Sequence, residues 1–155
     1  MLTGKSILLV DDEAGIRRLA ARAVAAAGGE SYGAANGVQA LVLLERFPID
    51  LAVVDILMPQ KEGIETIMEL KPRWPSVKVI AISGGGRLGA EEFLALASQI
   101  GADATMKKPL SFKDLVAMIA FLLDHETAGA AVSSSRWNET FAAGGGAGQG
   151  VFRAG

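Results

Sequence analysis

The stretch SILLVDDEAG at residues 6–15 decides the fold. Four apolar residues in a row, Ile7 to Val10, predict a short buried strand. Three acids, Asp11, Asp12 and Glu13, follow it at once. A buried strand that ends in a group of carboxylates predicts that its carboxyl end opens onto a polar site.

The same organisation continues outward from this stretch as far as residue 124. Apolar runs expected to form strands alternate with segments whose apolar residues recur at helical spacing. The expected strands cover residues 7–10, 31–35, 51–54, 77–82 and 104–107; the expected helices cover 16–27, 38–44, 64–72, 93–100 and 112–124. Five strands alternating with five helices predict a doubly wound α/β fold with a parallel sheet covered on both faces.

Chemically active residues stand where these strands end. Asp11 and Asp12 follow the first strand, and Asp55, Ser83 and Lys108 end the third, fourth and fifth. In a parallel α/β sheet these ends share one edge, where ligands bind. We therefore expect the five side chains to meet there, although any one of them alone is more often a helix cap or a surface residue.

The residue types at this edge favour phosphoryl chemistry with a hard cation. Three carboxylates without histidine or cysteine are suited to Mg²⁺, which prefers oxygen ligands. A carboxylate such as Asp55 can attack phosphorus and hold an acyl phosphate. Lys108 would supply a second cation, and the Ser83 hydroxyl could bind a phosphoryl oxygen.

Composition excludes several other classes. The 155 residues carry 15 basic and 17 acidic side chains, a net charge of −2, so a nucleic-acid partner is not expected. The absence of cysteine excludes disulfides and thiolate sites, and the single histidine argues against a histidine-based centre. No apolar run reaches membrane-spanning length, and the start of the chain does not resemble a signal peptide, so a cytoplasmic location is expected.

Four motifs in order carry a resemblance to the receiver domain of two-component response regulators, of the stand-alone chemotaxis-regulator type. They are LLVDDE at 8–13, LAVVDILMPQKEG at 51–63, VIAISG at 79–84 and KKPL at 107–110. The resemblance covers about residues 5–124 and implies a flavodoxin-like sheet with strand order 2-1-3-4-5.

The resemblance also implies a role for each site residue. Asp55 would accept a phosphoryl group from a sensor histidine kinase or a histidine phosphotransfer protein. Asp11, Asp12, Asp55 and the backbone carbonyl of Leu57 would hold Mg²⁺, and Ser83 and Lys108 would bind the phosphoryl group. The bond between Lys108 and Pro109 would be cis.

The resemblance further implies how such a protein would signal. It would be a single-domain regulator rather than a turnover enzyme. It would bind a target through the face made by the helix at 93–100, the strand at 104–107 and the helix at 112–124, or pass the phosphoryl group on. It would be a monomer or a phosphorylation-dependent dimer.

Two positions keep alternatives open. Receivers usually place an aromatic residue where this chain has Thr105, so the switch would be built differently, and a phosphate-independent binding module remains an alternative. A small Mg²⁺-dependent phosphatase with Asp55 as nucleophile is another. Enzymes of that kind need an acid two residues after the nucleophile, where this chain has Leu57.

Residues 125–155 differ from the rest of the chain. Glycine, alanine and serine dominate there without a sustained period, and we expect disorder or loose docking. The domain expected from the sequence is therefore 1–124, with 125–155 as a tail.

Overall fold

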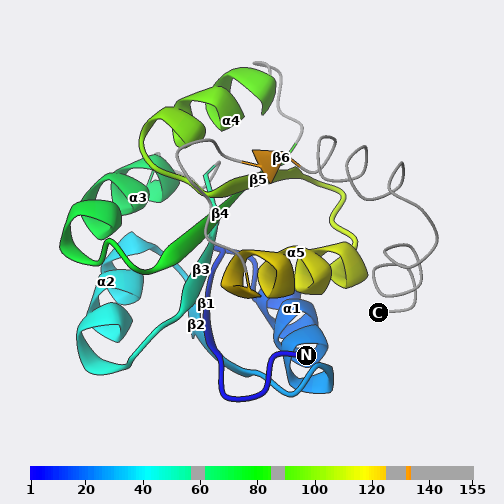
Figure 1. Ribbon diagram of the computed structural model, residues 1–155. Helices are drawn as coiled ribbons and strands as arrows, with labels where there is room; N and C mark the ends of the chain where they lie inside the picture. The colour runs from blue at the N-terminus through cyan, green and yellow to red at the C-terminus, as the bar shows by residue number, and fades with distance from the viewer. Residues whose placement is uncertain (57–61, 85–89, 125–131, 134–155) are drawn as a thin grey trace.

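The computed structural model describes residues 1–56, 62–84, 90–124 and 132–133, which form a parallel sheet with helices on both faces (Figure 1). The strand order is β2-β1-β3-β4-β5-β6. The five-strand core and its order agree with the prediction. The sixth strand was not predicted.

Strands and helices alternate along the chain. Their bounds are β1 Ser6–Val10, α1 Ala14–Ala26, β2 Glu30–Ala34, α2 Gly37–Arg46, β3 Leu51–Asp55, α3 Glu62–Arg73, β4 Lys78–Ser83, α4 Ala90–Gln99, β5 Ala104–Lys107, α5 Phe112–Asp124 and β6 Val132–Ser133. All the strand pairs are parallel, and Leu8, Ala52 and Val79 lie in neighbouring register across the centre of the sheet.

The alternation of side chains along each strand divides the core in two. Ile7 and Leu9 point to the face covered by α1 and α5, whereas Leu8 and Val10 point to the face covered by α2, α3 and α4. Both faces of the central strands are therefore buried. This burial explains why β1 and β3 are continuous apolar runs instead of alternating ones.

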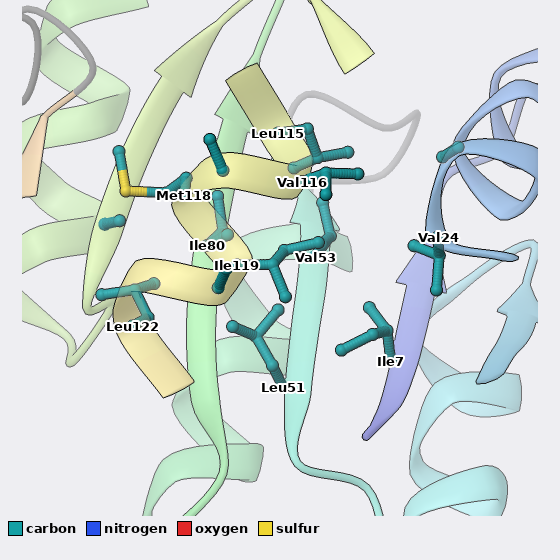
Figure 2. Packing of buried hydrophobic residues seen from close by; sticks show 14 of the residues in the cluster. Ile7, Val24, Leu51, Val53, Ile80, Leu115, Val116, Met118, Ile119 and Leu122 are labelled. Atoms are coloured by element: carbon teal, nitrogen blue, oxygen red, sulfur yellow. The ribbon is translucent and has the colours of Figure 1, made fainter. Parts of the chain in front are cut away.

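Helix α5 contributes more buried side chains to the first face than any other element (Figure 2). Leu115, Met118, Ile119 and Leu122 are each fully buried. Burying a side chain of this size stabilises the fold by about 1.5–3 kcal/mol, before the entropy of ordering it is subtracted. The helix is thus held against β3, β4 and β5, and the loop before it carries Lys108 to the edge of the sheet.

Local signals in the sequence set the helix ends. The Asn36 side chain accepts a hydrogen bond from the Gln39 N–H at 2.9 Å at the start of α2. The Ser111 hydroxyl oxygen accepts one from the Asp114 N–H at 3.3 Å at the start of α5. Helix α3 ends at Arg73, and Pro72 lies in its last turn.

None of the described helices combines the length and the apolar character needed to cross a lipid bilayer.

Candidate functional site

The residues expected at the carboxyl edge of the sheet do meet there. Asp11 follows β1, Asp55 is the last residue of β3, Ser83 is the last residue of β4, and Lys108 follows β5. Because the strands are parallel and in register, their ends place these side chains together. The backbone of Leu57, expected as a metal ligand, lies outside the described residues.

Lys108 lies at the centre of the group. Its Nζ donates to Asp55 Oδ2 at 3.0 Å and to Asp11 Oδ2 at 3.2 Å, and lies 3.9 Å from Glu13 Oε1. Asp55 is 4% exposed, so this pair is largely withdrawn from solvent. Burial by itself lowers the pKa of Lys108, but hydrogen bonding and attraction from Asp55, and then from Asp11, overcome it. The pKa of Lys108 is therefore raised and the ammonium group stays charged.

Asp11 is held by its own loop. Its Oδ1 accepts the Glu13 N–H at 2.9 Å, and its backbone carbonyl accepts a hydrogen bond from Arg17 Nη1 at 2.6 Å. Burial is the largest influence on its carboxyl and raises the pKa. The nearby charge of Asp55 acts in the same direction, while the Glu13 N–H and Lys108 oppose it. The net result is a raised pKa, so ionised Asp11 is in an unfavourable environment that a cation would relieve.

Three acids form a cluster with the dimensions of a metal site. Carboxylate oxygens of Asp11, Asp12 and Asp55 all lie within 4.8 Å of one another. Asp11 and Asp55 are buried and Asp12 is exposed, so the cluster opens to solvent on the side of Asp12. The ammonium group of Lys108 lies within 4 Å of three carboxylates, those of Asp11, Glu13 and Asp55, and Asp12 adds a fourth acid to the cluster. This charge balance and the all-oxygen donor set fit a divalent cation such as Mg²⁺.

Ser83 ends β4, the strand next to β3, and is fully buried. Its hydroxyl donates to the Gly84 carbonyl at 3.3 Å, which is a long and weak hydrogen bond. A Cβ at Gly84 would lie 3.5 Å from Lys108 Cδ, so the lysine side chain passes close to the backbone here. Ser83 can therefore turn its hydroxyl toward a new acceptor at small cost.

Gly63 allows the backbone of α3 to approach the end of β3. A Cβ built on Gly63 would overlap the Asp55 carbonyl oxygen and the Ile56 Cα. Gly63 is therefore a positioning residue for Asp55, because any side chain would push the two segments apart.

Two further features follow the sequence prediction. The first agrees with the receiver pattern, and the second departs from it. The peptide bond between Lys108 and Pro109 is cis. Thr105, at the position where receivers usually have an aromatic residue, is buried within β5 and pairs in register with Ala81 of β4.

The contacts of two residues at the site, Glu13 and Arg17, were not predicted. The Glu13 carboxylate faces Lys108, and the Glu13 N–H donates to Asp11 Oδ1. Arg17 lies in the helix expected at 16–27. Apart from its closeness in sequence to the acids, nothing in the sequence predicts its hydrogen bond to the Asp11 carbonyl.

Comparison with known proteins identifies a family whose model matches most of the chain. The family model of the response regulator receiver domain matches residues 7–120. The phosphate regulon transcriptional regulatory protein PhoB of Pseudomonas aeruginosa is 37% identical over 123 residues, which cover 79% of this chain and 53% of PhoB. The sensor kinase CckA of Brucella abortus is 33% identical over 126 residues, 78% of this chain and 13% of CckA.

Solved structures show the same fold. A CheY-like response regulator receiver domain protein from Methanospirillum hungatei superimposes with a TM-score of 0.69 at 31% identity, covering 80% of this chain and 95% of that one. The receiver domain of NtrX from Brucella abortus gives a TM-score of 0.70 at 29% identity, covering 77% and 99%.

These matches cover only part of the length of the two curated relatives. The chain spans about half of PhoB and a smaller share of CckA, so in these relatives it corresponds to one part of a longer protein. With the family model matched over most of its length, and with the acids, Ser83 and Lys108 together at one edge of the sheet, the chain belongs to the response regulator receiver domain family of two-component systems.

Proposed function

We propose that this receiver accepts a phosphoryl group on Asp55 in a Mg²⁺-dependent reaction. The donor would be the phosphohistidine of a sensor histidine kinase or of a histidine phosphotransfer protein. The observation that carries the proposal is the position of Lys108 Nζ, 3.0 Å from Asp55 and 3.2 Å from Asp11. A fixed cation beside a buried carboxylate suits a reaction that brings further negative charge to that carboxylate.

The chemistry at Asp55 is a transfer of one phosphoryl group. The bond between phosphorus and the histidine nitrogen breaks while a bond between phosphorus and an Asp55 carboxylate oxygen forms. The imidazole leaves with the electron pair of the broken bond and takes a proton from solvent. Lys108 would stabilise the charge of the phosphoryl oxygens, and the Ser83 hydroxyl would turn from Gly84 to donate to one of them.

Asp11, Asp12 and Asp55 would hold the Mg²⁺ ion, together with the carbonyl of Leu57. Bound there, the ion supplies charge neutralisation for the carboxylates and the incoming phosphoryl group. The raised pKa of Asp11 supports this assignment, because a carboxylate in an unfavourable buried environment gains from a cation.

The output of the phosphorylated receiver is part of the same proposal. It acts as a phosphoacceptor rather than as an enzyme with turnover. It signals by binding a protein through the face of α4, β5 and α5, or relays the phosphoryl group. Apolar Leu57, two residues after Asp55, supports this over a phosphatase because it cannot act as a proton donor.

Intact mass spectrometry tests the phosphoacceptor role. The protein is incubated with acetyl phosphate, with and without Mg²⁺, as the native chain, as Asp55→Asn and as Asp124→Asn, an exposed acid at the end of α5. One phosphoryl adduct that needs Mg²⁺ is expected in the native chain and in Asp124→Asn, and none in Asp55→Asn. An adduct of equal yield in Asp55→Asn would place the acceptor elsewhere.

A further inference from the structure

Strand β6 lies on the outer edge of β5, beyond the five-strand core (Figure 1). Val132 pairs with Ala104 and Ser133 pairs with Thr105, both in parallel. A receiver sheet of five strands would end at β5. In this chain a segment from beyond α5 supplies one more strand.

The path to β6 differs from every other strand connection in the fold. The connection from β1 to β2 runs toward one edge of the sheet with α1 on one face. The three connections from β2 to β5 run toward the other edge, with α2, α3 and α4 on the opposite face. These four connections therefore share one hand.

The connection from β5 to β6 has the other hand. It continues toward the second edge, but its helix α5 lies on the face of α1. Parallel crossovers are right-handed in nearly all cases, so the hand shared by four connections is the usual one and the fifth is the rare one. Strand β6 therefore does not follow the regular winding of the other five strands. It pairs with β5 through two residues, so the sheet can release β6 without losing its core.

The edge of β5 has little of the usual protection against pairing with another strand. With β6 in place, Ala104, Thr105 and Met106 are buried to the same degree as the central strands. The opposite edge strand, β2, is mostly half-buried or exposed and contains Glu30 and Gly33. Natural edge strands are usually protected by charges, proline or bulges, and within β5 Lys107 at its end is the one charged residue.

The backbone groups that β6 covers can be identified. The Lys108 N–H donates to the Ser83 carbonyl at 2.9 Å, toward β4. Because N–H groups along a strand alternate in direction, those of Met106 and Ala104 also point toward β4, whereas that of Thr105 points the other way, toward β6.

We propose that the outer edge of β5 is a strand-acceptor site that the chain fills with its own segment Val132–Ser133, and that this segment withholds the edge from a second copy of the chain. The uncharged sequence around the segment, TAGAAVSSS at 127–135, contains neither proline nor a charged residue that would oppose pairing. The proposal goes beyond the phosphoacceptor role, because it concerns backbone pairing at the edge of the sheet and holds whether or not Asp55 is phosphorylated.

Amide hydrogen exchange on the full chain tests whether Val132–Ser133 occupies the outer edge of β5. The double variant Val132→Pro with Ser133→Pro lacks the two N–H groups of β6. Exchange at Thr105 is expected to become at least tenfold faster than in the native chain, while Asp103, Ala104 and Met106, whose N–H groups point toward β4, serve as internal controls that stay protected. A second control variant, Ala142→Pro with Ala143→Pro, places the prolines beyond β6 and should exchange like the native chain.

Sedimentation velocity on the same proteins tests the consequence for self-association. At equal concentration the Val132→Pro and Ser133→Pro double variant is expected to form more dimer than the native chain and the control variant, because its β5 edge is open. Unchanged exchange at Thr105 would overturn the assignment of the occupant. Faster exchange without added dimer would overturn the protective role. Neither measurement depends on Asp55, so failure here is distinct from failure of the phosphoacceptor proposal.

Discussion

Lys108 Nζ bridges Asp55 and Asp11, at 3.0 Å and 3.2 Å, although 53 and 97 residues separate the lysine from these acids along the chain. The bridge joins the loops that follow β1 and β5 to the end of β3. It also places one ammonium group where a metal ion would neutralise the same carboxylates. We therefore expect stability, cation binding and the proposed phosphoryl transfer to be linked at this residue.

Replacing Lys108 with methionine should destabilise the metal-free protein. The change leaves the buried carboxylates of Asp11 and Asp55 facing each other without a cation, and we expect a loss of about 1.5–3 kcal/mol in the free energy of unfolding. Mg²⁺ should recover part of this loss. Urea unfolding in EDTA and in Mg²⁺ measures both effects.

The exposed neighbour Lys107 provides the matched control for this change. Lys107→Met should lose less stability than Lys108→Met and should show no greater gain from Mg²⁺ than the native chain. Equal losses in the two variants would mean that the bridge to Asp55 contributes nothing specific.

Replacing Asp11 with asparagine should stabilise the metal-free protein at neutral pH. The folded pKa of Asp11 is raised above its ordinary value of 3.8, chiefly by burial, so the ionised carboxylate is less favourable in the folded chain than in the unfolded one. Asparagine removes that charge and retains an oxygen that can accept the Glu13 N–H.

The sign of the pH dependence follows from the same shift. Above the raised pKa the native chain carries the full cost of ionised Asp11, and the cost is relieved as the pH falls through that pKa toward 3.8. The advantage of Asp11→Asn, measured by thermal unfolding in EDTA, should therefore be present at pH 7 and shrink on acidification. An advantage that grows on acidification would contradict the assigned shift.

The sequence was sufficient to predict the site because topology, not local structure, brings its residues together. Asp11, Asp55, Ser83 and Lys108 each stand at a strand end, and parallel strands align those ends. The positions of Arg17 and Glu13 depended on side-chain directions within a loop and on the first turn of α1. Hydrophobic periodicity contains no information about either.

The five-strand core of the fold could also be predicted from the sequence, because its hydrophobic pattern is regular. Apolar runs located the five core strands, and apolar residues at helical spacing located the helices between and after them. Strand β6 could not be foreseen, because Val132 and Ser133 lie in a segment without a pattern and pair through backbone groups that every residue carries.

Replacing Gly63 with alanine should be strongly destabilising. The added Cβ would overlap the Asp55 carbonyl oxygen and Ile56 Cα, which are backbone atoms that cannot rotate away. We expect a loss of about 1–3 kcal/mol, typical of an overpacked core position, together with slower phosphorylation of Asp55. Urea unfolding and the mass assay measure the two effects.

Gly15 in α1 is the control for Gly63, because a Cβ there meets nothing within 4 Å. Gly15→Ala should stabilise the protein by about 0.5–1 kcal/mol through helix propensity. If both alanine variants changed stability in the same direction, close packing at Gly63 would not be the cause.

Replacing Asp103 with alanine should weaken the junction of α3, β4 and β5. Asp103 Oδ2 accepts the Val79 N–H at 2.8 Å and Lys71 Nζ at 3.2 Å. Alanine leaves the Val79 N–H without this acceptor, at an expected cost of about 1–3 kcal/mol. Asp103→Asn, which keeps an oxygen for the Val79 N–H, should lose less, and denaturant unfolding of both variants separates the acceptor from the charge.

Replacing Ser83 with alanine should slow phosphorylation while leaving stability nearly unchanged. The hydroxyl makes one weak bond of 3.3 Å to the Gly84 carbonyl, so its loss costs little in folding. Losing a donor to the phosphoryl oxygens should reduce the initial rate of adduct formation by roughly ten- to a hundredfold. Ser83→Thr, which retains the hydroxyl, should stay near the native rate, and Ser31→Ala on β2 should not change it. A native rate in Ser83→Ala would show that the hydroxyl takes no part in the transfer, and a large loss of stability would show that it serves the fold instead.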